Sequence, residues 1–281
     1  MTQPPLIVCD LDGTLLRPDA TASGYTRDVL NRLIAAGIPT TIATARGLPS
    51  IRALLPDVEL ALPVIELGGS YVSDPATGRH LSHHTLDRGL AARVVDHLLT
   101  AGIEPSLTAW DGETDTVAYG DLTTPGTRWF YEEKRDLGDP RLRYCADFRA
   151  LTAEQRIALI RVSVPDADAE SFAKTLDTLC RGQASIVSMS NGYCPGQTEF
   201  GVHSPTADKG AAVRDLRERV GHTGELLVCG DHLNDLAMFA LADRRVAPSS
   251  AHPDVLALAT DVTGPNDEDG VARFLEREFL A

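Results

Sequence analysis

Two aspartates at the end of a short apolar run are the first residues whose types and spacing could do chemistry. Asp10 and Asp12 follow the run Leu6–Cys9, and Gly13 and Thr14 come directly after them. Such a run is typical of a buried parallel strand, and ligands bind at the carboxyl ends of these strands. Two poorly hydrated carboxylates held there repel each other, which favours a cation between them. We interpret the pair as a Mg²⁺ site with a nucleophilic carboxylate; the alternative is a simple turn.

The elements that must position these aspartates alternate along the chain. The first portion is expected to contain strands at 6–9, 38–44 and 60–66 and helices at 25–36 and 48–55. After residue 208 we expect strands at 225–229 and 245–247 and helices at 209–220, 234–242, 253–259 and 271–279. This alternation predicts an α/β fold, in which both portions contribute to one parallel sheet.

The pattern changes between these two portions. A β-hairpin is expected at 71–83, a helix at 86–101, further short strands, a strand at 159–164, a helix at 170–180 and a strand at 184–190. We expect residues 83–190 to form an inserted α+β domain, an antiparallel sheet backed by two helices. Residues 1–82 and 191–281 are then expected to form the core domain.

Composition narrows the classes of function. The 281 residues carry a formal net charge of −14, which argues against binding to nucleic acid or an anionic membrane, since both require a basic face. No apolar run reaches about 18 residues, and the start of the chain lacks the pattern of a signal peptide. The five cysteines have no paired or metal-binding spacing. We expect a cytoplasmic monomer or homodimer whose partner is a small molecule.

Four short motifs lie at the expected strand ends or helix starts. They are DLDGT at 10–14, TAR at 44–46, DKG at 208–210 and GDHLND at 230–235. In this order they resemble the four motifs of the haloacid dehalogenase superfamily, and the insert resembles the cap of its Cof-type (type IIB) branch. The resemblance implies a Rossmann-like core, helices on both faces of its sheet, and an inserted cap. It also implies a Mg²⁺-dependent phosphatase that acts on a small phosphorylated metabolite, with a sugar phosphate as the expected substrate.

The resemblance implies a role for each matching residue. Asp10 would be the nucleophile that forms an aspartyl-phosphate, and Asp12 would be the general acid and then the general base. Thr44 and Lys209 would complete the catalytic set. The expected ligands of Mg²⁺ are Asp10, the main-chain carbonyl of Asp12, Asp231 and Asp235. The expected substrate-binding residues are Thr44, Arg46, Gly69, Lys209 and Asn234.

Each assignment has a plainer alternative. Lys209 could be a solvated first-turn lysine, Asp231 a helix N-cap, and Arg46 the partner in a surface salt bridge. The sequence also departs from its relatives after the third strand, where Gly68-Gly69 stands in place of their usual Asn-Gly. Two other functions remain open, a sugar phosphomutase of the same superfamily and a non-catalytic regulator that binds a sugar phosphate.

Overall fold

The structure is a computed structural model of the chain and describes residues 3–280. It divides the chain into two compact units, a core of Met1–Ser82 with Asp208–Ala281 and an insert of His83–Ala207. The insert therefore ends at residue 207 and not at the expected 190. The reason is strand β11 (Gln197–His203), which pairs antiparallel with β9 (Arg156–Pro165) and so belongs to the sheet of the insert.

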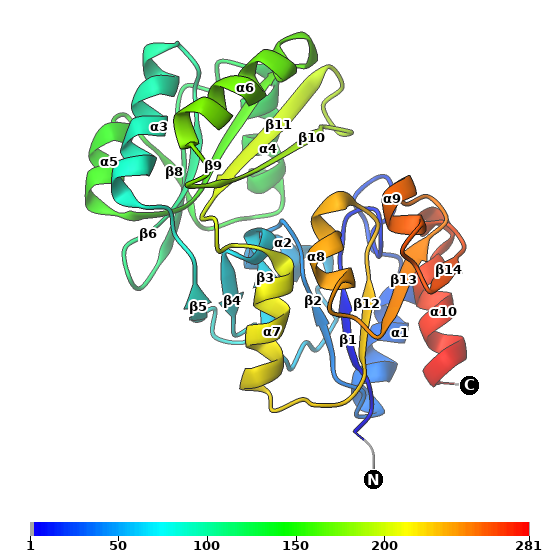
Figure 1. The fold of residues 1–281 in the computed structure, drawn as a ribbon. Helices are drawn as coiled ribbons and strands as arrows, with labels where there is room; N and C mark the ends of the chain where they lie inside the picture. The colour runs from blue at the N-terminus through cyan, green and yellow to red at the C-terminus, as the bar shows by residue number, and fades with distance from the viewer. Residues whose placement is uncertain (1–2, 281) are drawn as a thin grey trace. The chain divides into compact units, whose positions relative to one another are not determined.

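A five-stranded parallel sheet forms the centre of the core unit (Figure 1). Its strands, in spatial order, are β14 (Asp261–Thr263), β13 (Arg244–Pro248), β12 (Leu226–Cys229), β1 (Leu6–Cys9) and β2 (Thr40–Ile42). The middle strand β1 pairs with β2 on one side and with β12, from the other end of the chain, on the other. The prediction of one parallel sheet built from both portions is confirmed, while β14 was not predicted.

Helices cover both faces of this sheet, which explains the unbroken apolar run of β1. Ile7 and Cys9 belong to one hydrophobic cluster and Leu6 and Val8 to another, so successive residues pack into opposite layers. The helices of the core unit are α1 (Gly24–Ala35), α2 (Leu48–Leu54), α7 (Lys209–Arg219), α8 (Leu236–Phe239), α9 (Pro253–Leu256) and α10 (Gly270–Phe279). No helix in residues 3–280 has the length and apolar character that crossing a membrane requires.

The third expected strand differs from the prediction. Strand β3 (Val64–Glu66) belongs to a separate three-stranded sheet with β4 (Tyr71–Ser73) and β5 (His80–His83). Its recorded link to the parallel sheet is a single parallel bridge between Ala43 and Ile65. Residues 60–63 therefore lie outside the strand, although the hairpin that follows forms as expected.

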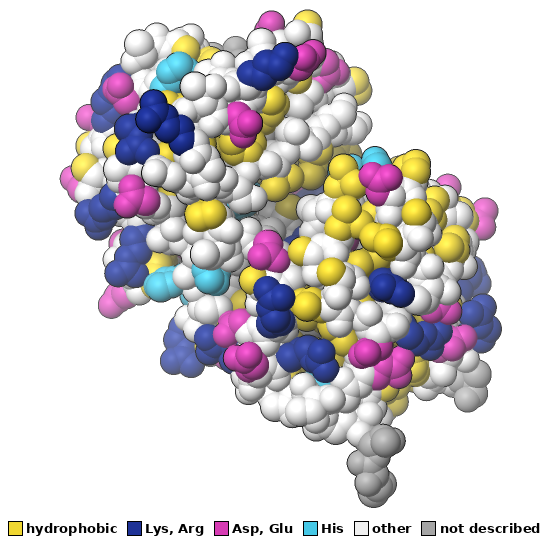
Figure 2. All heavy atoms as spheres, in the orientation of Figure 1, with side chains coloured by type: hydrophobic (Ala, Val, Ile, Leu, Met, Phe, Trp, Pro, Cys, Tyr) yellow, Lys and Arg dark blue, Asp and Glu magenta, His cyan; other side chains and the backbone are white. Residues whose placement is uncertain are grey.

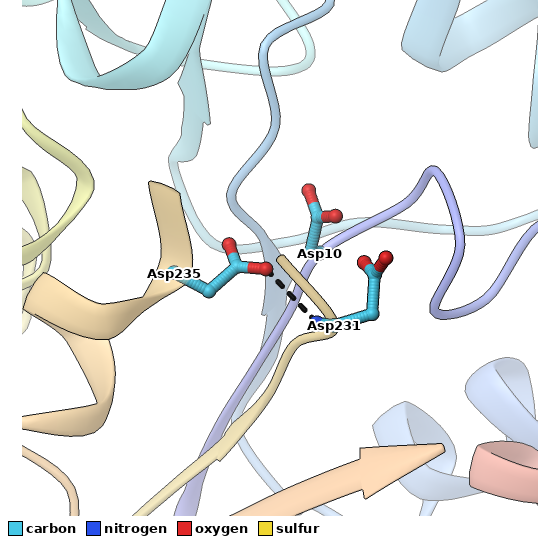
Figure 3. Close-up of side chains that lie close together, drawn as sticks. All are labelled: Asp10, Asp231 and Asp235. Carbon is cyan, nitrogen blue, oxygen red and sulfur yellow. Dashed lines mark hydrogen bonds between the residues drawn. The ribbon is translucent and has the colours of Figure 1, made fainter. Parts of the chain in front are cut away.

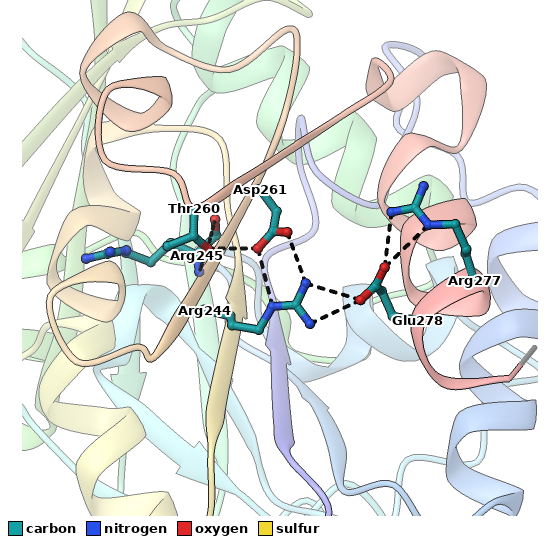
Figure 4. A network of polar contacts seen from close by, with 6 residues as sticks. All are labelled: Arg244, Arg245, Thr260, Asp261, Arg277 and Glu278. Atoms are coloured by element: carbon teal, nitrogen blue, oxygen red, sulfur yellow. Dashed lines mark hydrogen bonds and ion pairs between the residues drawn. The ribbon is translucent and has the colours of Figure 1, made fainter.

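A network of charged side chains ties the last helix to the edge of the parallel sheet (Figure 4). Arg244 of β13 pairs with Asp261 of β14 at 3.0 Å and with Glu278 of α10 at 3.3 Å. Arg277 also reaches Glu278, at 3.2 Å. Two strands and the last helix are thereby joined at the side of the sheet that lies away from β2.

The insert contains a six-stranded sheet and four α-helices. In spatial order the strands are β10 (Ser185–Ser190), β11, β9, β6 (Ser106–Trp110), β7 (Asp115–Tyr119) and β8 (Leu142–Tyr144). The helices are α3 (Arg88–Thr100), α4 (Pro125–Asp136), α5 (Phe148–Glu154) and α6 (Ala169–Cys180). The α+β class is confirmed, but the prediction of two helices is wrong, because α4 and α5 were missed. The β7–β8 pair is parallel and the other recorded pairs are antiparallel.

Candidate active site

Neighbouring strands bring the first and fourth motifs together. Cys9 of β1 lies opposite Cys229 of β12, so the residues that follow each strand meet at the same edge of the sheet. Carboxylate oxygens of Asp10, Asp231 and Asp235 lie within 4.8 Å of one another. Figure 3 shows these side chains converging, with the backbone N–H of Asp231 donating to the carboxylate of Asp235 at 3.0 Å. The convergence expected from the motifs is therefore present.

Lys209 is the cation of this cluster. Its Nζ donates to Oδ1 of Asp10 and to Oδ1 of Asp235, both at 2.7 Å, and its side chain is 1% exposed. Asp208 caps the start of α7 by accepting a hydrogen bond from the backbone N–H of Ala211, which fixes the turn that delivers the lysine. The alternative of a solvated first-turn lysine is wrong.

The acids outnumber the cation that serves them. Burial, opposed by Lys209, raises the pKa of Asp10 well above its usual value. Burial and the neighbouring charge of Asp235 raise the pKa of Asp231 to about 6. Both shifts have the same cause, because two buried carboxylates and a partly buried one share a single ammonium group and lack positive charge.

The residues present fit a divalent metal ion. Carboxylate and amide oxygens are the hard donors that Mg²⁺ prefers, and an ion would supply the missing charge. The buried Oδ1 of Asn234 has no hydrogen-bond partner among the described residues, as expected for a group that faces a water or ligand. One carboxylate oxygen of Asp235 accepts a hydrogen bond from Lys209, and the other accepts from the backbone N–H groups of Asp231 and His232. Asp235 therefore holds Lys209 and the loop that carries Asp231 in position.

Gly13 allows Asp231 to approach the first loop. Gly13 has a φ of +76°, and a Cβ atom at this position would lie 2.2 Å from Oδ2 of Asp231. The hydroxyl of Thr14 donates to Oδ1 of the same carboxylate at 2.9 Å. Sequence reasoning gave Thr14 no role, although its place within the first motif was a usable signal. The loop after β1 thus orients Asp231 as well as carrying Asp10.

Asp12 points to a different partner. Nε of Arg46 donates to Oδ2 of Asp12 at 2.8 Å, and Nη2 donates to Oδ1 at 2.7 Å. The Arg46 side chain is 9% exposed and that of Asp12 is 36% exposed, so the arginine lies behind a carboxylate that solvent can reach. Arg46, which was expected to bind substrate, contacts the predicted general acid. This pair is not the surface salt bridge of the alternative, because the arginine is buried.

Thr44 and Gly69, two other residues expected to bind substrate, have local contacts of their own. Thr44 is fully buried, and its hydroxyl oxygen accepts a hydrogen bond from the backbone N–H of Arg46 at 3.2 Å. Gly69 has a φ of +101°, and a Cβ atom there would lie 2.4 Å from the carbonyl group of Asp208. A glycine is therefore required at position 69 by packing, because Asp208, the N-cap of α7, approaches it closely.

Comparisons with known proteins agree with this geometry. The family model described as haloacid dehalogenase-like hydrolase matches residues 7–275. The 5-amino-6-(5-phospho-D-ribitylamino)uracil phosphatase YwtE of Bacillus subtilis (strain 168) is 28% identical over 96% of each chain. The HMP-PP phosphatase of Cronobacter sakazakii is also 28% identical, over 88% of this chain and 85% of its own.

Solved structures show the same fold. A haloacid dehalogenase-like hydrolase from Bacteroides thetaiotaomicron superposes with a TM-score of 0.81 at 23% identity, over 98% of this chain and 100% of its own. The subclass IIB sugar phosphatase BT4131 superposes with a TM-score of 0.79 at 18% identity, over 99% of this chain and 100% of its own. The expected capped α/β fold is confirmed, and the chain is an enzyme that belongs to the haloacid dehalogenase-like hydrolases.

Proposed function

We propose that this hydrolase is a metal-dependent phosphatase of small phosphomonoesters, with Asp10 as its nucleophile. The observation that carries the proposal is the buried contact of Asp10 with Lys209 beside Asp231 and Asp235. A buried carboxylate with a raised pKa is a poor nucleophile unless cations keep it ionised. The cluster supplies one such cation and the ligands for another.

The chain's own residues divide the work of the reaction. Bound by Asp10, Asp231 and the main-chain carbonyl of Asp12, Mg²⁺ would offset the repulsion between the nucleophile and the phosphoryl oxygens. An oxygen of Asp10 attacks phosphorus, and the ester oxygen leaves with a proton from Asp12. Asp12 then takes a proton from the water that hydrolyses the aspartyl-phosphate. The hydroxyl of Thr44 donates a hydrogen bond to a phosphoryl oxygen, and Lys209 keeps Asp10 ionised.

The substrate is proposed to carry its phosphate on a sugar or sugar-alcohol carbon. The name of one relative places the phosphate on a D-ribityl chain, and one structural neighbour is described as a sugar phosphatase. In both cases the leaving group is an alkoxide, which needs a proton donor. Asp12 fits that requirement. The insert is proposed to act as a mobile cap that selects the rest of the substrate.

The test is the Asp10→Asn variant, assayed by release of inorganic phosphate from p-nitrophenyl phosphate and a panel of sugar phosphates. We expect no turnover above background, with the melting temperature of a folded protein. Asp28→Asn is the matched control, because the Asp28 side chain is 63% exposed and lies on α1. Full activity in Asp10→Asn would contradict the assignment. Conversion of hexose phosphates into isomers without free phosphate would instead identify a mutase.

A further inference from the structure

The ion pair between Arg46 and Asp12 restricts how the Asp12 carboxylate can be oriented. Both oxygens of the Asp12 carboxylate accept from one guanidinium, at 2.8 and 2.7 Å. A two-point contact of this kind fixes the plane of a carboxylate as well as its position, which a single hydrogen bond does not. The orientation of the Asp12 side chain is therefore set by Arg46, which belongs to the second motif.

Arg46 is itself held by its backbone. Its N–H donates to the hydroxyl oxygen of Thr44 at 3.2 Å, and its carbonyl oxygen accepts from the N–H of Leu67 at 3.0 Å. The next residue, Gly47, is the N-cap of α2. The guanidinium thus extends from a segment anchored to the strand end that carries Thr44, and the 9% exposure of its side chain limits the rotamers that it can adopt.

The geometry points to Arg46 as a positioning residue that aims the Asp12 carboxylate, and not as a ligand of the substrate phosphate. Nε and Nη2, two of the three nitrogens with which Arg46 could bind a phosphate, are both directed at Asp12. The carboxylate is the more exposed partner, at 36%. The guanidinium is thus the buried partner and the carboxylate is the one that solvent reaches, as expected of an acid held in place by a cation.

This inference rests on the proposed function, in which Asp12 protonates the leaving oxygen, and it makes a prediction about leaving groups. If the Asp12 carboxylate is no longer oriented, the rate of hydrolysis should fall most for esters whose leaving oxygen requires a proton. It should fall least for esters whose leaving group is a stable phenolate. General acid catalysis contributes about 10²- to 10⁴-fold to a reaction that depends on it. The dependence of rate on the leaving group therefore separates a positioning role from a contact with the phosphate, which every ester shares.

The experiment measures kcat/KM for p-nitrophenyl, phenyl and p-methoxyphenyl phosphates, which have similar shapes and leaving groups of different stability. In Arg46→Gln we expect a loss of about 100-fold for phenyl and p-methoxyphenyl phosphates and less than about tenfold for p-nitrophenyl phosphate. Asp12→Asn should show the same pattern, and the double variant should be no worse than Asp12→Asn alone. Arg52→Gln is the control, because Arg52 is exposed on α2 and its hydrogen bonds within residues 3–280 go to backbone carbonyls of the following hairpin turn.

Each other outcome overturns the inference. Equal losses for all three esters would mean that Arg46 contacts the phosphate or supports the fold, and unchanged rates would mean that Asp12 is aimed without it. If Arg46→Gln fails to fold, Arg46→Lys decides, because lysine keeps the charge but cannot make the two-point contact. We expect it to reproduce the leaving-group pattern; wild-type rates in this variant would refute the inference. Activity in Asp10→Asn would refute the proposed function itself, and is therefore a separate failure.

Discussion

Replacement of Gly13 by alanine tests how the active site is assembled. The added Cβ atom would lie 2.2 Å from Oδ2 and 2.6 Å from Cγ of Asp231, whereas ordinary contacts are 3.4–4 Å. The carboxylate must therefore retreat by roughly 1 Å, and a displacement of that size costs about 100-fold in rate when it affects a catalytic group. We expect kcat/KM of Gly13→Ala to fall by about 100-fold.

Backbone strain must be separated from this displacement. Gly13 has a φ of +76°, where alanine is unfavourable by roughly 1 kcal/mol. Gly37 offers a matched control, because its φ of +75° is nearly the same and a Cβ atom there would meet nothing within 4 Å. Both variants should lose a similar amount of stability, and only Gly13→Ala should lose activity.

The assay is hydrolysis of p-nitrophenyl phosphate over a range of Mg²⁺ concentrations, together with thermal unfolding of both variants. Because Asp231 is a proposed metal ligand, Gly13→Ala should also require more Mg²⁺ for half of its maximal rate. Equal activity of Gly13→Ala and Gly37→Ala would refute the reasoning. It would show that the position of Asp231 is not set by its contact with the loop after β1.

Two further predictions follow from the charges of buried groups. EDTA should abolish hydrolysis and Mg²⁺ should restore it, and Mg²⁺ should raise the melting temperature, because an ion that binds only the folded acid cluster stabilises the folded state; turnover that survives EDTA would contradict the site. Burial lowers the pKa of His203 from 6.5 to about 4, so the unfolded chain binds a proton that the folded chain does not between these values. Stability should therefore fall as the pH decreases from 6.5 to 4, by about 3 kcal/mol from this group. The free energy of unfolding of His203→Phe, measured by urea titration at several pH values, should lack this share of the pH dependence, and an unchanged slope would contradict the assignment.

The core and its acid cluster could be predicted from sequence because local patterns determine them. The run Leu6–Cys9 is apolar at every position, and only a strand with a hydrophobic layer on each face buries all four residues. Once β1 and β12 are recognised as parallel neighbours, the acids that follow each of them must converge. Lys209 was predicted in a different way, from the resemblance of DKG at 208–210 to the third motif of the superfamily. A lysine in the first turn is also slightly unfavourable beside the positive end of a helix dipole, which favoured a functional role.

The pairing of Arg46 with Asp12 could not be predicted in the same way. These residues are 34 positions apart, and the contact depends on side-chain rotamers that no periodicity encodes. Helix α4 is a different kind of omission. The stretch was read only as part of several short strands. Thr124 and Thr127 form a capping box, however, and Pro125 occupies the first turn, and these signals predict a helix start.

On the face drawn in Figure 2, acidic and basic side chains are interspersed. Despite the formal net charge of −14, this face is therefore not uniformly acidic. The attraction of a phosphate ester to the site must therefore come from local positive charge, and not from the net charge of the whole protein.

The order of strands in the core has a consequence for synthesis of the protein. Strand β1 obtains its second neighbour only when residues 226–229 have left the ribosome, whereas the whole insert, His83–Ala207, is made before then. The insert can fold while the edge of β1 is still open and its apolar residues are unprotected. Until residues 209–235 have been made, Asp10 has neither Lys209 nor Asp231 and Asp235 beside it. We therefore expect a chain released before this point to be inactive.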